Sequence, residues 1–274
     1  MTCLACTVRT CGAPLERKES TWVCVRGHSY DEARSGYVNL LQPQDRRSAA
    51  PGDSKDQVAA RARLLAAGIG ATIVDAFVRR AASLELGPRP HVVDLGSGSG
   101  EVLGGLVRGG PIAAVGIDLS SAAADHAARR YPDVTWVVAN ADRRLPMGDA
   151  TMALVVSLHG RRNPGECARV LVPGGWLLVG VPGRDDLGEL RASVQGQSIE
   201  RDRIDAVVDE HAPGFTLRER SSATERQLLS RESLLDVLRG TYRGARKSDA
   251  ARLEALETLE VTLASDFLLF ARRG

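Results

Sequence analysis

The fold is decided by the stretch His91-Val92-Val93-Asp94-Leu95-Gly96-Ser97-Gly98-Ser99-Gly100. A hydrophobic strand that runs into an acidic residue and three alternating glycines is typical of a Rossmann-like sheet. There the glycines let the backbone come close to a nucleotide-shaped ligand. The Gly-x-Gly-x-Gly spacing is tighter than the Gly-x-Gly-x-x-Gly that seats a dinucleotide pyrophosphate on a helix N-terminus. The spacing therefore favours S-adenosylmethionine (SAM) over a dinucleotide.

A second acidic residue at a predicted strand end is Asp118, which follows the hydrophobic run 112–117. Neighbouring parallel strands end at the same edge of a sheet, so a carboxylate here would receive the two ribose hydroxyls of a cofactor lying across the strand ends. A glycine triplet alone is a weak signal. Together with an acid after the following strand, it predicts a SAM site at this edge.

From residue 91 onward, strand-like and helix-like segments alternate, which is typical of a parallel sheet covered on both faces. The predicted strands are 91–95, 112–117, 134–139, 152–158 and 174–181, and the predicted helices are 100–108, 120–130 and 164–171. Upstream we expect helices at 58–67, behind a capping box, and at 71–86. Downstream we expect strands at 214–220 and 259–271, with helices near 230–239 and 248–257. This pattern predicts an α/β fold of the Rossmann-like class I methyltransferase type, with a seven-stranded, mostly parallel sheet.

The composition is that of a soluble globular protein, with 274 residues, 43% hydrophobic and 26% charged. No apolar run approaches the ~20 residues of a membrane span, and the N-terminus lacks the apolar segment of a signal peptide. We therefore expect a cytoplasmic location. The formal net charge of +2 gives no argument for nucleic acid from the overall field.

Four of the five cysteines lie within the first 24 residues. In a cytosolic chain such a cluster more often binds metal than forms disulfides. Residues 1–36 carry too little hydrophobic pattern to be held by burial alone, and a metal would supply the missing stability. Cys11 and Cys24 stand in two tight turns, and His28 follows Cys24 at a spacing typical of zinc ligands. The alternative is that the metal has been lost and the thiols are free.

Three segments carry a resemblance: the Cys/His turns, then Gly36-Tyr37-Val38-Asn39-Leu40-Leu41, then Pro51-Gly52-Asp53. With these segments the chain resembles the 23S ribosomal RNA (guanine-N1)-methyltransferases over nearly its whole length. The Gly-Tyr-Val-Asn-Leu-Leu segment is the most specific part, because other SAM enzymes lack it. The resemblance implies a zinc-binding N-terminal domain that helps recognise a ribosomal RNA hairpin. It also implies a class I domain that transfers methyl from SAM to N1 of a guanine.

A division of the chain follows from this resemblance. Residues 1–36 would form the zinc-binding RNA-recognition domain, 37–88 a connector with helices, and 89–274 the SAM-dependent methyltransferase domain. Relatives act on the macrolide-binding region of the ribosomal tunnel, so an effect on macrolide susceptibility or resistance is a hypothesis for this chain. Some relatives are thought to pair so that two zinc modules form one RNA cleft, which makes a homodimer a further hypothesis.

The resemblance also suggests the metal ligands. The first turn of the family usually reads Cys-x2-Cys, whereas position 8 here is valine, so the first ligand would be Cys6 through a longer loop to Cys11. Cys24 and His28 would complete a closed tetrahedral zinc site. Cys3 is the rival first ligand.

The residues assigned to the cofactor share the carboxyl edge of the predicted sheet and are Asp94, Gly96, Gly98, Gly100, Val102, Leu103, Asp118 and Asp142. Asp94 would fix the glycine loop or meet the methionine amine. Val102 and Leu103 map to family positions that touch the cofactor. Asp142 has the place from which class I enzymes bind the adenine amino group, although it could instead cap a turn.

The methyl acceptor should sit beyond the fourth strand, at residues 157–163. Methylation of guanine N1 requires removal of its proton, so a histidine or a carboxylate would serve as the base. His159 is the first candidate and Asp186, where the family has a histidine, is the second; His159 could instead be a polar rim residue. Arg161 and Arg162 would hold phosphates around a flipped base, or simply face water.

Two other functions compete with this hypothesis. The chain could be a small-molecule SAM methyltransferase of a natural-product pathway, with the zinc module as a structural relic. It could also be an RNA-binding protein that retains the fold without turnover. A small-molecule enzyme predicts a deep, closed apolar pocket, whereas an RNA enzyme predicts an open cleft with a basic rim shared by the two domains.

Overall fold

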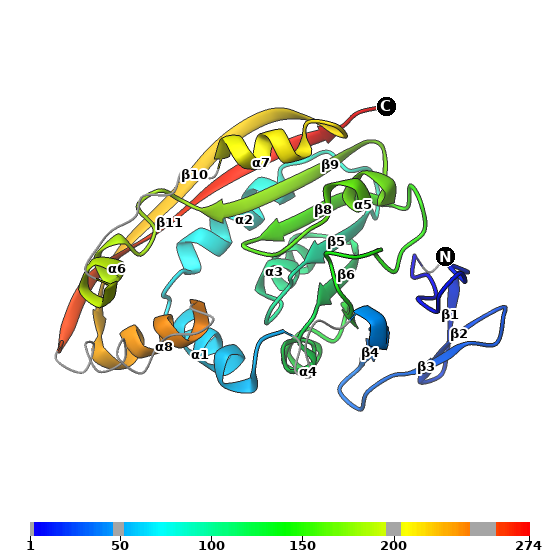
Figure 1. The fold of residues 1–274 in the computed structure, drawn as a ribbon, viewed down its shortest axis with the longest axis horizontal. Helices are drawn as coiled ribbons and strands as arrows, with labels where there is room; N and C mark the ends of the chain where they lie inside the picture. The colour runs from blue at the N-terminus through cyan, green and yellow to red at the C-terminus, as the bar shows by residue number, and fades with distance from the viewer. Residues whose placement is uncertain (1–2, 46–51, 196–203, 242–255) are drawn as a thin grey trace.

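The computed structural model describes residues 3–45, 52–195, 204–241 and 256–274, which form a large mixed sheet and a small antiparallel one (Figure 1). The strands are β1 (Leu15–Lys18), β2 (Thr21–Cys24), β3 (Ser29–Asp31), β4 (Tyr37–Asn39), β5 (His91–Leu95), β6 (Ala113–Asp118), β7 (Thr135–Val138), β8 (Met152–Leu158), β9 (Leu171–Pro182), β10 (Phe215–Ser230) and β11 (Thr258–Arg272). The helices are η1 (Pro43–Asp45), α1 (Lys55–Ala66), α2 (Ala71–Ala82), α3 (Glu101–Gly109), α4 (Ser121–Arg130), α5 (Pro164–Val170), α6 (Gly188–Gln195), α7 (Ile204–His211) and α8 (Arg231–Thr241).

The large sheet has the order β10-β11-β9-β8-β5-β6-β7-β4. Strands β4 to β9 pair in parallel, and β11 and β10 pair antiparallel at one side. The predicted class I fold is confirmed, but the expected count of seven strands is wrong. The eighth strand, β4, comes from the predicted connector: Val38 is buried, and the backbone of β4 pairs with β7. Pairing satisfies backbone groups that would otherwise be buried without partners.

Helices cover both faces of the sheet. Side chains of α2, α3 and α4 pack with alternate residues of the strands, such as Val92 and Leu154, on one face. The residues between them, such as Val93 and Val155, pack on the other face with α5 and α7. This alternation is the period of two that a sheet buried on both faces requires.

The closing hairpin of β10 and β11 is much longer than predicted. β11 pairs with β9 only over residues 265–271, so its first half extends with β10 beyond the carboxyl edge of the sheet. There it packs with α1, α6 and α8 around a core of its own that includes Leu190, Leu234 and Val261. An ion pair between Arg63 and Asp236 joins α1 to α8, with both nitrogen-to-oxygen distances at 2.7 Å. This assembly forms a wall beside the carboxyl edge.

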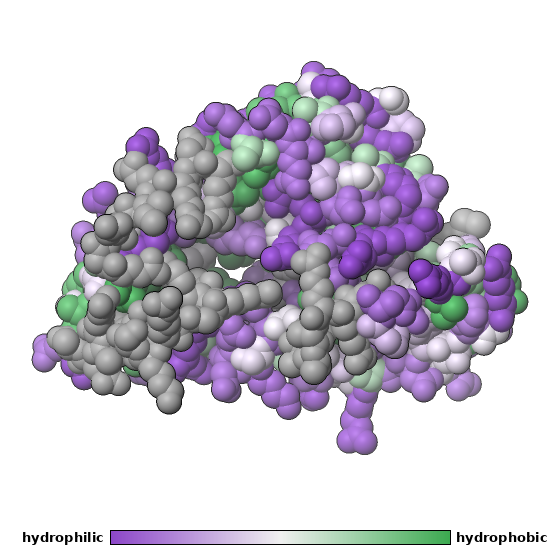
Figure 2. Space-filling view, in the orientation of Figure 1, coloured by the Kyte–Doolittle hydropathy of each residue, from purple (hydrophilic) through white to green (hydrophobic). Residues whose placement is uncertain are grey.

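Figure 2 shows the surface hollowed between that wall and the carboxyl edge of the sheet. The hollow lies where a class I fold holds its ligands, outside the carboxyl ends of the parallel strands.

The small sheet packs against the methyltransferase domain. Leu4 forms a bridge with Met147, and the amide of Ala5 donates to the carbonyl of Pro146 at 2.9 Å. Leu15 and Trp22 lie in the same core cluster as Leu95 and other residues of the large sheet. The ribbon formed by residues 3–36 is therefore continuous in packing with the domain that follows.

Most predicted elements match those of the structure, including the capping box of Ser54 and Gln57 before α1. The helix predicted at 248–257 falls mostly outside the described residues. None of the described helices is long and apolar enough to cross a membrane.

Candidate functional site

The glycine loop after β5 folds over the end of β6. The amides of Gly96 and Ser97 both donate to the carbonyl of Ile117, at 2.8 and 3.0 Å. Gly96, Gly98 and Gly100 have φ values of 74°, 53° and 91°, a region that side-chain-bearing residues rarely adopt. The three glycines are thus required by the backbone path of the loop.

Asp94 is the next-to-last residue of β5, directly before this loop, and is 2% exposed. Burial, together with the charges of Asp118 and Glu101, raises the pKa of Asp94 to about 8. Its Oδ1 atom is buried and has no hydrogen-bond partner among the described residues. With that pKa the carboxyl group is mostly protonated at pH 7. A cationic donor such as the amine of SAM would favour its charged form and give the buried oxygen a partner, so this place fits such a ligand.

Asp118 ends β6 and is held by two backbone amides. Gly98 donates to its Oδ2 atom at 2.9 Å, and Ser120 donates to its Oδ1 atom at 2.8 Å. These bonds fix the carboxylate at the carboxyl edge, next to the glycine loop. Each oxygen has a second lone pair, and the position fits the role of receiving ribose hydroxyls.

Gly52 and Asp53 reach this same corner. The hydroxyl of Ser120 donates to the carbonyl of Asp53 at 2.6 Å, and a Cβ on Gly52 would stand 2.5 Å from the backbone nitrogen of Ser120. The φ of Gly52 is 82°. The segment therefore closes over Asp118 only because residue 52 is glycine.

Gly52→Ala should lower SAM affinity about 10-fold, because the segment must retreat from Ser120 and loosen the Asp118 corner. Calorimetric titration with SAM measures this. Gly87→Ala is the matched control, since Gly87 also has a positive φ but a Cβ there would meet nothing within 4 Å. Equal losses in both variants would contradict a role for the close approach.

The remaining cofactor candidates lie around this corner. Val102 and Leu103 are buried in the first turn of α3, within the core. Asp142 follows β7, and its Oδ2 atom accepts a 3.0 Å hydrogen bond from Arg161. Arg161 thus pairs with the proposed adenine ligand.

The two candidates for the base meet at the point where β11 leaves the sheet. The Nε2 atom of His159 lies 2.8 Å from the hydroxyl of Ser265, and Oδ1 of Asp186 accepts from the amide of Ala264 at 3.0 Å. His159 as a whole residue is exposed, whereas burial around its imidazole lowers the pKa, so the imidazole is neutral at pH 7. Burial raises the pKa of Asp186 to about 6, against the opposing effect of the Ala264 amide.

The backbone is strained at both places. His159 has a φ of 58°, and Leu187, next to Asp186, has a φ of 53°. Non-glycine residues in this region are uncommon and cluster at functional sites. The strain supports the hypothesis that the two loops are shaped for a ligand.

Gly160 is a residue whose role the sequence did not reveal. A Cβ there would lie 2.1 Å from the carbonyl oxygen of Leu95, and a Cβ on Gly96 would lie 2.7 Å from the Cα atom of Gly160. The glycine loop and the acceptor loop after β8 therefore touch backbone to backbone. Only long-range packing shows this; a glycine two residues after a predicted strand end was the available signal.

The two arginines after Gly160 differ. Arg161 has an exposed side chain, paired with Asp142. Arg162 is packed inward: its Nε atom donates to Nε2 of the fully buried His211 at 3.2 Å. The interpretation that both simply face water is therefore wrong for Arg162, which ties the acceptor loop to α7.

The structure brings four potential metal ligands together in the ribbon. The ligand atoms of Cys6, Cys11, Cys24 and His28 all lie within 4.8 Å of one another. The sulfurs of Cys11 and Cys24 are 3.9 Å apart, and Nδ1 of His28 lies 3.4 and 3.5 Å from the sulfurs of Cys6 and Cys24. Sulfurs about 2.3 Å from a tetrahedral zinc ion stand about 3.8 Å apart, so the set fits zinc. Cys3 is not part of this cluster.

Tyr30 supports the first turn and was missed in the sequence. Its hydroxyl lies 3.1 Å from the sulfur of Cys6 and accepts from the amides of Thr7 and Val8, both at 3.2 Å. Groups that orient metal ligands tune metal affinity. An aromatic residue in a short strand gives no signal of such a role.

Tyr30→Phe should lower zinc affinity about 10-fold, because Cys6 loses its donor and two amides lose their acceptor. Competition with a chromogenic chelator measures this. Tyr37→Phe serves as the control, since Tyr37 lies in β4, outside the cluster. An unchanged zinc affinity in Tyr30→Phe would remove Tyr30 from the site.

Comparison with known proteins identifies two parts of the chain. A family described as "RlmA, N-terminal" matches residues 5–49, and one described as "Methyltransferase domain" matches residues 92–175. A protein of Micromonospora griseorubida, provisionally named a 23S rRNA (guanine-N1-)-methyltransferase, is 33% identical over 273 residues, which is 92% of this chain and 90% of that protein. The chain belongs to the 23S rRNA (guanine-N1)-methyltransferase family.

Another member of this family, the 23S rRNA (guanine(748)-N(1))-methyltransferase of Streptomyces fradiae, is 39% identical over 184 residues. That alignment covers 66% of this chain and 64% of the relative, so the chain spans just under two thirds of it. Among solved structures, a provisionally described methyltransferase of Bacillus halodurans C-125 has a TM-score of 0.53 at 16% identity, over 73% of this chain and 98% of that one. This likeness shows the methyltransferase fold.

Proposed function

We propose that this chain transfers the methyl group of SAM to N1 of a guanine in 23S ribosomal RNA. The observation that carries the proposal is the carboxyl edge of the sheet, where Asp94 and the amide-held Asp118 flank the glycine loop and Oδ1 of Asp94 has no partner among the described residues. The end-to-end similarity to rRNA methyltransferases supports the choice of substrate. A basic pocket shared by the ribbon and the catalytic domain agrees with RNA more than with a small molecule.

The chain's own residues would hold both substrates. Asp94 would pair with the amine of SAM, Asp118 with its ribose, and Asp142 with its adenine. When bound, SAM supplies the electrophilic methyl group. Gly96 and Gly160, in backbone contact, would keep the donor loop and the acceptor loop at a fixed separation, as near-attack geometry requires.

The N1 proton of guanine needs an acceptor. Both His159 and Asp186 stay candidates, but the contacts favour Asp186. Its raised pKa makes it a stronger base than an ordinary carboxylate, and one of its oxygens makes no hydrogen bond with another described residue. His159 has a lowered pKa, and its Nε2 atom is engaged by Ser265. His159 would then position the acceptor loop.

The rate should therefore depend on pH through Asp186. The carboxylate form is the base, so activity rises as pH increases through a midpoint near 6. With that midpoint, kcat/KM at pH 5 should be about a tenth of its value at pH 7. Asp186→Asn should lose this rise of activity with pH, together with most of the rate. Asp185→Asn, at an exposed neighbour, should keep both. If Asp186→Asn kept the rise of activity with pH, another group would be the acceptor of the N1 proton.

Finer features of the function follow from the resemblance alone. We infer a hairpin as the RNA element, a homodimer as the assembly and the cytoplasm as the location. Primer extension across methylated RNA would map the hairpin, and sedimentation equilibrium would measure the assembly. Macrolide susceptibility of cells with and without the gene would test the drug hypothesis.

The direct test incubates the protein with tritiated SAM and unmodified 23S rRNA fragments, followed by mapping of the label. Label at N1 of one guanine supports the proposal. Label only on small metabolites would favour the natural-product alternative. SAM and RNA binding without any transfer would favour the non-catalytic alternative.

A further inference from the structure

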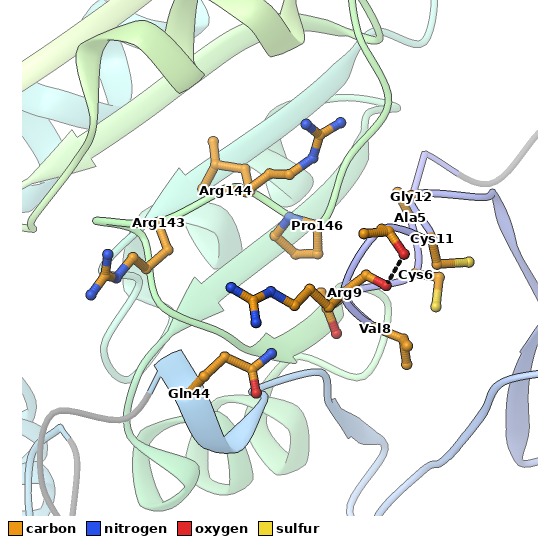
Figure 3. A pocket seen from close by; sticks show the side chains of 13 residues that line it. Ala5, Cys6, Val8, Arg9, Cys11, Gly12, Gln44, Arg143, Arg144 and Pro146 are labelled. Carbon is orange, nitrogen blue, oxygen red and sulfur yellow. Dashed lines mark hydrogen bonds between the residues drawn. The ribbon is translucent and has the colours of Figure 1, made fainter.

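A second pocket lies between the ribbon and the catalytic domain. It has a volume of about 580 Å³ and is lined by residues 5–12 of the ribbon, Gln44 of η1 and residues 143–146 of the segment after β7. Figure 3 shows the Arg9 side chain extending across it toward Arg143, with Gln44 on the adjacent side. The pocket is separate from the candidate SAM site at Asp94, Asp118 and the glycine loop. It adjoins that site in sequence, because Arg143 directly follows Asp142.

The charge of this pocket is one-sided. Three arginines, Arg9, Arg143 and Arg144, belong to the lining, and no acidic residue does. All three side chains are exposed. Within the described part of the chain, none of their guanidinium groups makes an ion pair or a hydrogen bond. Unpaired arginines gathered around a concave site favour an anion, and their planar donors match phosphate.

The walls of the pocket are held firmly, so it exists before any ligand arrives. Glu166 accepts from the amide of Leu145 at 2.8 Å, and Arg169 donates to the carbonyls of Leu145 and Met147 at 3.0 and 2.8 Å. The ribbon is attached to this same segment through Ala5 and Pro146. A preformed site loses less entropy on binding.

Gly12 brings the two walls close. An atom at its Cβ position would lie 4.0 Å from a terminal nitrogen of Arg144, and its φ is 63°. The metal-binding turn and the arginine pair thus meet at one rim, so the cysteine cluster fixes where Arg9 stands relative to Arg143 and Arg144.

We propose that this pocket binds a backbone phosphate of the RNA substrate through Arg9, Arg143 and Arg144. The assignment rests on the proposed function. A phosphate held here links the ribbon to the segment that follows the adenine ligand Asp142, and so sets the register of the RNA strand against the methyl-transfer edge. Phosphate contacts of this kind position a nucleic acid without reading its sequence.

The test compares two triple variants of equal charge change. One replaces Arg9, Arg143 and Arg144 by glutamine. The other replaces Arg79, Arg89 and Arg218, which are also exposed and lie outside the pocket. Binding of a 23S rRNA hairpin fragment is measured by fluorescence anisotropy from 50 to 300 mM KCl (a range of about six-fold, chosen to resolve the salt slope). SAM affinity and zinc content are measured alongside.

The pocket variant should bind RNA about 10-fold more weakly or worse, and its slope of log affinity against log salt should fall by about 1, since about 0.7 to 0.9 counterion is released per phosphate contact. Its SAM affinity and zinc content should stay unchanged. The slope of the control variant should differ from the wild-type slope by less than about half of the change expected for the pocket variant. An equal fall in both variants, or an unchanged slope in the pocket variant, would overturn the proposal.

Two further outcomes separate the alternatives. If wild-type protein methylates RNA while the pocket variant binds it normally, the pocket assignment fails and the proposed function stands. If wild-type protein neither binds nor methylates RNA, the proposed function fails as well. Inorganic phosphate is the second probe: phosphate binding to the pocket with RNA binding unaffected by the triple variant would assign the site to a small anion instead and overturn the proposal.

Discussion

Cys6→Ser and Cys24→Ser are each expected to abolish stable zinc binding and to unfold the ribbon of residues 3–36. The ribbon has three short strands and few buried side chains of its own, so the metal must supply much of its stability. Structural zinc contributes about 10 kcal/mol or more in comparable small modules. Zinc content by atomic absorption, and amide exchange across the ribbon, measure the two effects.

Cys3→Ser is the matched control for this prediction, because Cys3 lies near the cluster in sequence but outside it in space. It should retain one zinc ion per chain. Loss of zinc in Cys3→Ser and retention in Cys6→Ser would make Cys3 the first ligand. SAM affinity should stay within a few-fold of wild type in all three variants, since the glycine loop lies at the strand ends. If it disappears with the metal, the shared core of Leu4, Leu15 and Met147 couples the two parts.

The sequence predicted the central elements well because they are decided locally. Each of β5 and β8 is a short, mostly apolar run, and their bounds agree with the prediction. The helix α1 begins at a capping box whose two hydrogen bonds are both present. Patterns of this kind need no knowledge of the rest of the chain.

The missed elements depend on distant partners. β4 has three residues, too few for a pattern, and exists because β7 offers a free edge. β10 was predicted to end at residue 220, but it continues to Ser230 because β11 pairs with it throughout. Tertiary context decides strands more strongly than propensity does.

The candidate site shows the same division. Residue types at strand ends, such as Asp94 and Asp118, could be predicted because topology places them at one edge. The different environments of these two carboxyl groups could not be predicted. Only the fold shows that the Oδ1 atom of Asp94 has no hydrogen-bond partner among the described residues, while Asp118 is held by two amides.

That difference leads to the last prediction. Asp118→Ala should weaken SAM binding at least about 100-fold, because two charge-assisted hydrogen bonds to the ribose, each worth roughly 1.5 to 3 kcal/mol, would be lost. The loss of its bonds to Gly98 and Ser120 would loosen the loop as well. Asp118→Asn should fall between alanine and wild type, since an amide oxygen can accept from one amide but cannot take both hydroxyls as a carboxylate does.

Asp125→Ala provides the control for calorimetric titration with SAM. Asp125 lies on the next helix, α4, and is paired with Arg129 at 3.0 Å on the surface, so its removal should cost only a few tenths of a kcal/mol in stability. Its SAM affinity should equal that of wild type. Asp118→Ala with unchanged affinity and an intact melting transition would show that the ribose is bound elsewhere, since the loop would then tolerate the loss of the carboxylate without any effect on the ligand.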